Sequence, residues 1–248
     1  MVIYKGISEN EVALTFDDGP NPEVTPRILQ VLKEKNVKAT FFLIGRRAEE
    51  YPETVKLIIS EGHDVGNHSY SHASGGLLLV GAEKGDQGII DEIKKASDAI
   101  KMIAGITDKE LQFYRPQGIK WKNEWGELAK PFFGDNIIMS NVGSNDFNWN
   151  DKTHIWDEND LSGIRLQAQK IIADVSSNAE PGSIISLHDS GEYCLEGNCT
   201  YLSWMNRALP TLEALPTIID NLRKKGLTII RLGEMKPDIV GIKNESKP

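Results

Sequence analysis

Two adjacent carboxylates are the first residues of this chain whose types suggest chemistry. Asp17 and Asp18 follow the apolar run Val12 to Phe16, and Gly19-Pro20 comes directly after them. The run predicts a buried strand, and the glycine-proline pair predicts its end. Because adjacent like charges repel, we expect a cation to neutralise one carboxylate, or its pKa to change. An ordinary turn is the alternative, since Asp before Gly is common in turns.

A pair of histidines later in the chain offers nitrogen ligands. His68 and His72 are four residues apart, a spacing that puts both on one face of a helical turn. Two neutral imidazoles and one carboxylate suit Zn²⁺ or a similar ion and leave positions open for water and substrate. Two surface histidines are the alternative, but the chain has only five His and this pair follows a predicted buried strand. With Asp18 as the third ligand, the metal interpretation is the stronger one.

Two more polar residues follow predicted strands. His188 ends an apolar run, where it could act as a general acid near neutral pH or serve as a structural histidine. Arg115 follows Phe113-Tyr114 and could pair with Asp17, holding it ionised and oriented, or form an ordinary surface ion pair. For His63 and His154 a structural or solvated role is favoured.

The elements that must position these residues alternate between strand and helix. Seven strands are predicted, followed in most cases by a helix, and the segment 73–88 is predicted as a glycine-rich loop. The strands are 12–16, 38–45, 64–66, 111–114, 136–142, 183–187 and 227–232, and the helices are 23–36, 46–61, 89–103, 121–133, 160–177 and 211–225. This order predicts one α/β domain, 1–236, with a polar tail, 237–248. A closed or nearly closed parallel barrel is favoured over an open doubly wound sheet, and in both the functional residues gather at the carboxyl ends of the strands.

The composition argues against some classes of binding partner. The 248 residues carry a formal net charge of −8, which argues against binding to a nucleic-acid backbone. The sequence contains no apolar run of about 18 residues, so no membrane span is expected, and the N-terminus lacks a signal-peptide pattern. Cys194 and Cys199 could close a small disulfide loop or remain free thiols, depending on the compartment.

Four segments together resemble the polysaccharide deacetylases, the family-four carbohydrate esterases with a NodB-homology domain. The resemblance extends from about Glu11 to Met235. Its first two motifs are highly specific. The segments are Thr15-Phe16-Asp17-Asp18-Gly19-Pro20, the stretch from Gly62 to His72, Arg115-Pro116-Gln117-Gly118 and Leu187-His188-Asp189. The family implies a distorted (β/α) barrel, in agreement with about seven parallel strands.

The resemblance also implies roles for individual residues. Asp17 is the expected base and His188 the expected acid, while Arg115 orients Asp17. The metal, Zn²⁺ or Co²⁺ or another divalent transition ion, is expected on Asp18, His68 and His72. The expected substrate contacts are Trp149, a backbone N–H near Gly118, and Leu187.

The chain departs from the family motifs at four positions. Asn145 and Asn148 stand where the fourth motif has Asp, Ser186 stands where a Leu usually walls the acetyl pocket, and Gln117 replaces a usual Pro. These changes leave the metal ligands intact and concern the level of activity and the acyl preference.

The expected function is removal of acetyl groups from a glycan containing N-acetylglucosamine, such as chitin or peptidoglycan. The alternatives are an O-acetyl xylan esterase, a catalytically weak sugar-binding member of the family, and a hydrolase of small amides. We expect a monomer with an acetylated polysaccharide or oligosaccharide as its partner. The family resemblance favours an extracellular or cell-envelope location.

Overall fold

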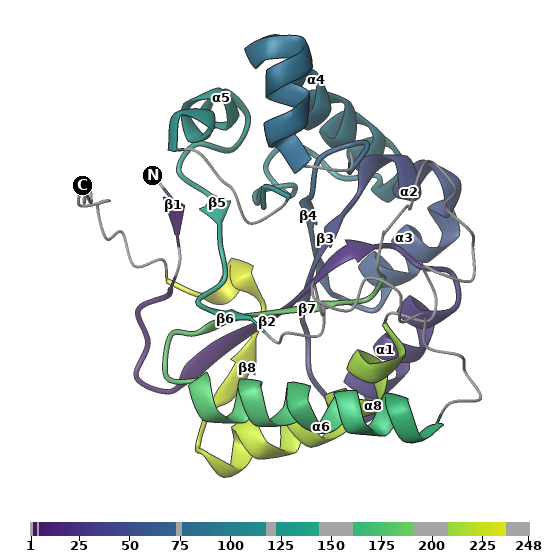
Figure 1. Cartoon of the computed structure of the whole chain (residues 1–248), viewed down its shortest axis with the longest axis vertical. Coiled ribbons are helices and arrows are strands. Elements are labelled where there is room, and N and C mark those ends of the chain that lie inside the picture. The colour runs from purple at the N-terminus through teal and green to yellow at the C-terminus, as the bar shows by residue number, and fades with distance from the viewer. Residues whose placement is uncertain are drawn as a thin grey trace.

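A long central strand, β2 (Glu11–Gly19), organises the fold (Figure 1). The computed structural model describes residues 2–3, 5–72, 76–117, 123–143, 161–190 and 208–236. Strand β7 (Ile184–His188) runs parallel to β2 along one edge. On the other edge, β3 (Thr40–Leu43) pairs with the later half of β2 and β8 (Thr228–Ile230) with its start. Both carboxylates of the first motif therefore lie near the carboxyl end of the most fully paired strand.

The remaining strands close the sheet into a ring. Strand β4 (Asp64–Asn67) pairs with β3, Asn67 bridges to Tyr114, and Tyr114 bridges to β5 (Ile137–Ile138). Strand β6 (Val142–Gly143) follows β5 in the chain and pairs with β7, and β1 (Val2–Ile3) pairs with β5. All these pairings are parallel, and the segment of β5 and β6 joins the β4 edge to the β7 edge, so the prediction of a distorted barrel is confirmed. The expected strand 111–114 is reduced to the bridges at Tyr114, and the expected strand 136–142 is split into β5 and β6.

Helices lie around the outside of this sheet, with α6 and α8 side by side (Figure 1). The described helices are α1 (Val24–Glu34), α2 (Gly45–Glu50), α3 (Pro52–Ser60), α4 (Gly76–Ala104), α5 (Asn123–Phe133), α6 (Leu161–Asn178), α8 (Leu209–Lys224) and the 3₁₀ turn η1 (Leu232–Glu234). None of these helices has the length and apolar character that crossing a membrane requires.

One helix prediction and one loop prediction were wrong. The expected helix 46–61 is two helices, because Pro52 lacks the N–H that would continue the first one and begins α3 instead. Most of the expected loop 73–88 is the first part of α4, which is interrupted where Gly85 adopts a φ of 65°. The described glycines of that segment are therefore accommodated within a broken helix: Gly76, Gly81, Gly85 and Gly88.

Alternation along the strands sorts side chains between two layers. Val12, Leu14 and Phe16 of β2 belong to the large core cluster that also contains the buried faces of the helices. Ala13 belongs to a smaller cluster inside the ring, which includes Ile184 of β7. Successive strand residues face opposite sides, so Asp17 shares the inner face with Ala13. Burying each large apolar side chain contributes about 1.5–3 kcal/mol, so a one-residue slip that exchanged the faces is strongly disfavoured.

Candidate metal centre

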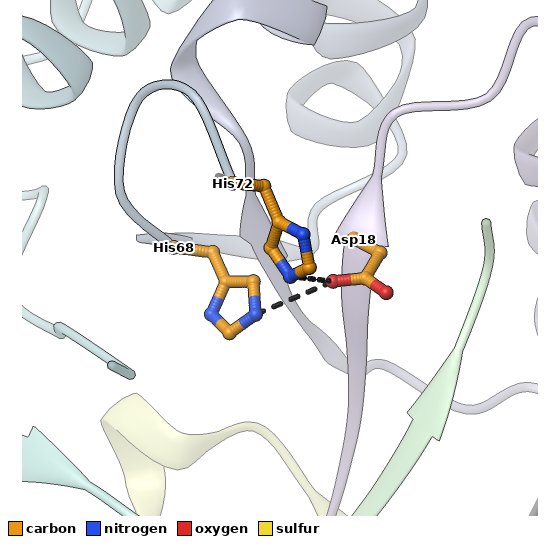
Figure 2. Close-up of side chains that lie close together, drawn as sticks. All are labelled: Asp18, His68 and His72. Carbon is orange, nitrogen blue, oxygen red and sulfur yellow. Dashed lines mark ion pairs between the residues drawn. The ribbon is translucent and has the colours of Figure 1, made fainter. Parts of the chain in front are cut away.

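The structure brings together the three residues predicted as metal ligands (Figure 2). One ligand atom from each of Asp18, His68 and His72 lies within 4.8 Å of the others. Oδ1 of Asp18 is 3.0 Å from Nε2 of His72 and 3.3 Å from Nε2 of His68. Asp18 and His68 are each only 4% exposed. Two imidazole nitrogens and one carboxylate oxygen thus converge at the carboxyl ends of β2 and β4.

Unusual backbone conformations produce this convergence. Asp18, Ser69 and His72 have φ values of 73°, 67° and 48°, in the left-handed region that few residues other than glycine adopt. At Asp18 the conformation coincides with a register shift between β2 and β3 and interrupts the alternation of side chains. The prediction that a helical turn carries His68 and His72 was wrong, because both lie in a loop that follows β4. Backbone strain of this kind clusters at functional sites.

Side chains at the end of β4 and on α4 hold that loop in place. Oδ1 of Asn67 accepts a hydrogen bond from Ser69 N at 2.7 Å, while its Nδ2 donates to helix α4. Oε2 of Glu92, on α4, accepts hydrogen bonds from Tyr70 N at 3.1 Å and Ser71 N at 2.7 Å. The role of Glu92 was not predicted, and nothing in its sequence neighbourhood distinguishes it from the other acidic residues of that helix.

A hydrogen bond at Nδ1 of His68 leaves Nε2, the nitrogen that faces Asp18, available to bind a cation. Nδ1 of His68 lies 2.8 Å from the carbonyl oxygen of Arg115, which can only accept, so Nδ1 carries a proton and donates it. In the neutral ring, Nε2 is then a lone pair facing the carboxylate of Asp18. Two acceptors 3.3 Å apart require a proton or a metal ion between them. A donor set of two neutral histidines and one carboxylate fits a divalent transition metal.

The electrostatics of Asp18 suit a ligand. Burial, the largest influence, acts to raise the pKa of Asp18, but without a metal the positive charge of His72 and hydrogen bonds from protonated His68 and His72 outweigh it. The pKa of the carboxyl group is held well below its usual value. Asp18 therefore stays ionised at neutral pH, as metal binding requires.

Asp17 is held separately, on the inner face of β2. Its Oδ1 lies 2.6 Å from Nη1 of Arg115, and both side chains are buried, so the predicted pair is present and is not a surface ion pair. Arg115 also donates to Oγ1 of Thr15 at 2.7 Å and lies over the ring of Phe42, with its Cζ 4.1 Å from the centroid. The second oxygen of Asp17 accepts a hydrogen bond from Oγ of Ser186 at 2.8 Å.

His188 is the last residue of β7, and Asp189 follows it directly. His188 is the register partner of Asp17, which places the expected acid and the expected base on neighbouring strands. The buried carboxyl group of Asp189 accepts a hydrogen bond from Oγ1 of Thr25 and packs against Gly19, where a Cβ atom would collide with it. Burial raises the pKa of Asp189 to about 7. Asp189 thereby fixes the turn that follows the two carboxylates of β2.

The remaining predicted residues are placed differently. Leu187 is fully buried in the large core cluster, and on β7 it faces the opposite side from Ser186, so we no longer propose it as a substrate contact. His63 has the structural role that was favoured: its Nδ1 accepts a hydrogen bond from Ala39 N at 3.1 Å. The other predicted positions lie outside the described residues: Gly118, Asn145, Asn148, Trp149, His154, Cys194, Cys199 and the tail 237–248.

Comparisons with known proteins agree with this arrangement. The family profile described as polysaccharide deacetylase matches residues 5–131. The peptidoglycan-N-acetylglucosamine deacetylase of Bacillus cereus is 33% identical over 229 residues, which cover 91% of this chain and 68% of that protein. The chitooligosaccharide deacetylase of Rhizobium leguminosarum bv. trifolii is 31% identical over 224 residues, covering 90% of this chain and 91% of that protein.

A solved structure of another deacetylase has the same fold. The crystal structure of a peptidoglycan N-acetylglucosamine deacetylase in complex with 4-naphthalen-1-yl-N-oxidanyl-benzamide superposes with a TM-score of 0.70 at 31% identity, covering 95% of this chain and 92% of that one. Both the sequence and the fold therefore place this chain in the polysaccharide deacetylase family, the family-four carbohydrate esterases.

Proposed function

We propose that this chain is a divalent-metal-dependent deacetylase that hydrolyses the acetamido group of N-acetylglucosamine residues in a glycan. The observation that carries the proposal is the separation of two neighbouring carboxylates. Asp18 faces two histidine nitrogens, while Asp17 is held apart from them by Arg115. Such a division leaves one carboxylate to bind a metal and the other to move a proton.

The ligands proposed for the metal are Asp18, His68 and His72, as predicted, with Zn²⁺ or Co²⁺ as the first ions to test. A bound divalent cation supplies Lewis acidity, polarising the acetyl carbonyl and lowering the pKa of water. Three protein ligands are typical of catalytic sites that keep positions open for water and substrate.

In this proposal Asp17 is the general base. An ionised carboxylate has about four lone-pair sites, so Asp17 can accept from Arg115 and Ser186 and still take a proton from the attacking water. The water oxygen bonds to the carbonyl carbon, the carbon–nitrogen bond breaks, and His188 gives a proton to the leaving nitrogen. The products are acetate and a free amine on the sugar.

The substrate class rests on the relatives. The Bacillus cereus relative is named for N-acetylglucosamine of peptidoglycan and the Rhizobium relative for chitooligosaccharides. Both names describe glycans that contain N-acetylglucosamine, so these glycans are the substrates we propose here. Trp149 and the backbone N–H near Gly118 remain predicted substrate contacts.

Acetate release tests the proposal. Enzyme stripped by a chelator is expected to be inactive on acetylated chito-oligosaccharides or peptidoglycan and to recover with Zn²⁺ or Co²⁺. Asp17→Asn should bind metal normally and lose turnover by about 10²–10⁴-fold, the usual contribution of a general base. Asp18→Ala should lose metal and turnover together.

The control removes the exposed acid Asp91, through Asp91→Ala, and should leave both properties unchanged. Normal turnover in Asp17→Asn would refute the base assignment. Glycan binding without acetate release by the metal-loaded wild type would favour the sugar-binding alternative over the enzyme.

A further inference from the structure

Ser186 is a buried hydroxyl group beside the proposed base. It lies on the inner face of β7, is 8% exposed, and is the register partner of Thr15 of β2. Its Oγ is 2.8 Å from Oδ2 of Asp17. Because an ionised carboxylate can only accept, the serine hydroxyl donates this hydrogen bond.

The two oxygens of Asp17 therefore have different donors. Arg115 donates to Oδ1 at 2.6 Å, and Ser186 donates to Oδ2 from the neighbouring strand. The last torsion of an aspartate side chain is broad, so a single donor leaves the carboxylate plane poorly defined. Each oxygen has one donor: Arg115, which follows the bridge at Tyr114, and Ser186, which lies on β7. Together these two donors fix the carboxylate plane.

The neighbouring hydroxyl group has a different task. Oγ1 of Thr15 donates to the carbonyl oxygen of Ile185 at 2.7 Å and accepts from Arg115. Its proton is committed to the backbone of β7, so it supports Arg115 and does not reach Asp17. Ser186 and Arg115 both donate a side-chain hydrogen bond to this carboxylate.

We propose that Ser186 is a positioning residue that fixes the carboxylate plane of Asp17 for proton transfer. The inference rests on the proposed function, and it gives a role to a serine at a position where the family motif usually has leucine, a residue that cannot donate a hydrogen bond. In this chain the base is aligned by two donors, and its turnover depends on the hydroxyl group of residue 186.

The test compares Ser186→Ala with Ser186→Thr in the zinc-loaded enzyme, measuring kcat and KM for acetate release from an acetylated chito-oligosaccharide. Misalignment of a general base should lower kcat by about tenfold in Ser186→Ala while KM and Zn²⁺ affinity, measured by calorimetry, stay within about twofold of wild type. Ser186→Thr keeps the hydroxyl group and should restore kcat to within about threefold of wild type. Melting curves verify folding, and if the threonine variant does not fold, Ser186→Cys, which keeps a weak donor, takes its place.

Ser183→Ala is the matched control, because Ser183 is a buried serine just before the same strand and its hydroxyl contacts Glu180 and Asn141 instead of Asp17. It should keep wild-type kcat. A wild-type kcat in Ser186→Ala would overturn this inference and leave the proposed function standing. The same holds if the threonine or cysteine variant is as slow as the alanine variant. A wild-type enzyme that releases no acetate with any metal would overturn the proposed function together with this inference.

Discussion

The two halves of the site are built by different means. The proposed ligand half, made of Asp18, His68 and His72, depends on left-handed backbone conformations and on a loop held by α4. The proposed base half, made of Asp17 and its donors, depends on regular strand alternation and register for Asp17 and Ser186. Regular strands can therefore hold one buried carboxylate in place without distortion, whereas bringing side chains from two strand ends together requires the backbone to leave the strand conformation.

Arg115→Met should have the largest effect and should separate the halves. It leaves the buried carboxylate of Asp17 without its charged partner, which is expected to lower the free energy of unfolding by about 3–5 kcal/mol. Turnover should fall with it. Metal affinity should remain within about threefold, because the partner of His68 is the backbone carbonyl of residue 115 and not its side chain. Urea unfolding and metal titration measure the two effects.

Arg231→Met is the control for this substitution. Arg231 pairs with Asp64 at 3.2 Å, but its side chain is 34% exposed, so its loss should change stability by about 1 kcal/mol or less. If Arg115→Met lost metal affinity as steeply as turnover, the division into two halves would be incorrect.

Glu92→Ala should damage the ligand half alone. Without the carboxylate that accepts from Tyr70 N and Ser71 N, the loop carrying His72 loses its anchor on α4. Loss of such supporting groups typically reduces metal affinity about 10–100-fold, and kcat at saturating metal should stay within about twofold. Calorimetric titration with Zn²⁺ measures the first, and acetate release the second. The control variant Asp91→Ala removes an exposed acid from the same helix and should change neither Zn²⁺ affinity nor kcat. Equal Zn²⁺ affinities in the two variants would contradict the proposed anchoring role of Glu92.

His63→Gln should have the smallest effect and should leave both halves unchanged. Burial, the largest influence, lowers the pKa of His63 to about 4, whereas the unfolded chain takes up a proton near pH 6.5. Because the unfolded state binds the proton first, His63 removes stability as the pH falls from about 6.5 towards 4. Between pH 7.5 and 5.5 the wild type should lose about 1 kcal/mol more than His63→Gln. Urea midpoints at the two pH values test this, and identical pH profiles would show that His63 is not buried as a neutral group.

The succession of strands along the chain, and the polar residues that follow them, could be read from the sequence because these patterns are local. An apolar run ending in Asp17-Asp18-Gly19 specifies both a strand and the place where it ends. The two histidines were correctly grouped with Asp18, but their helical spacing was misleading, since the four-residue separation is spanned by a loop with left-handed residues. A local sequence pattern therefore predicts which residues lie close together more reliably than it predicts the backbone conformation that brings them together.

The supporting residues could not be predicted, because they act across long sequence separations. Glu92 is one of several acids on an amphipathic helix, and only the packing of α4 against the β4 loop selects it. Ser186 was interpreted by its place in a motif, and its contact with Asp17 depends on the register of β2 and β7. The same register puts Leu187 among the helices, which a motif cannot show.

Arg115 serves both halves at once, since its guanidinium group contacts Asp17 and its carbonyl group accepts from His68. The spacing between Asp17, the proposed base, and His68, a proposed metal ligand, therefore depends in part on the atoms of one residue. A displacement of Arg115 would therefore affect Asp17 and His68 together, whereas a displacement of α4 would act through Glu92 on the loop that carries His72.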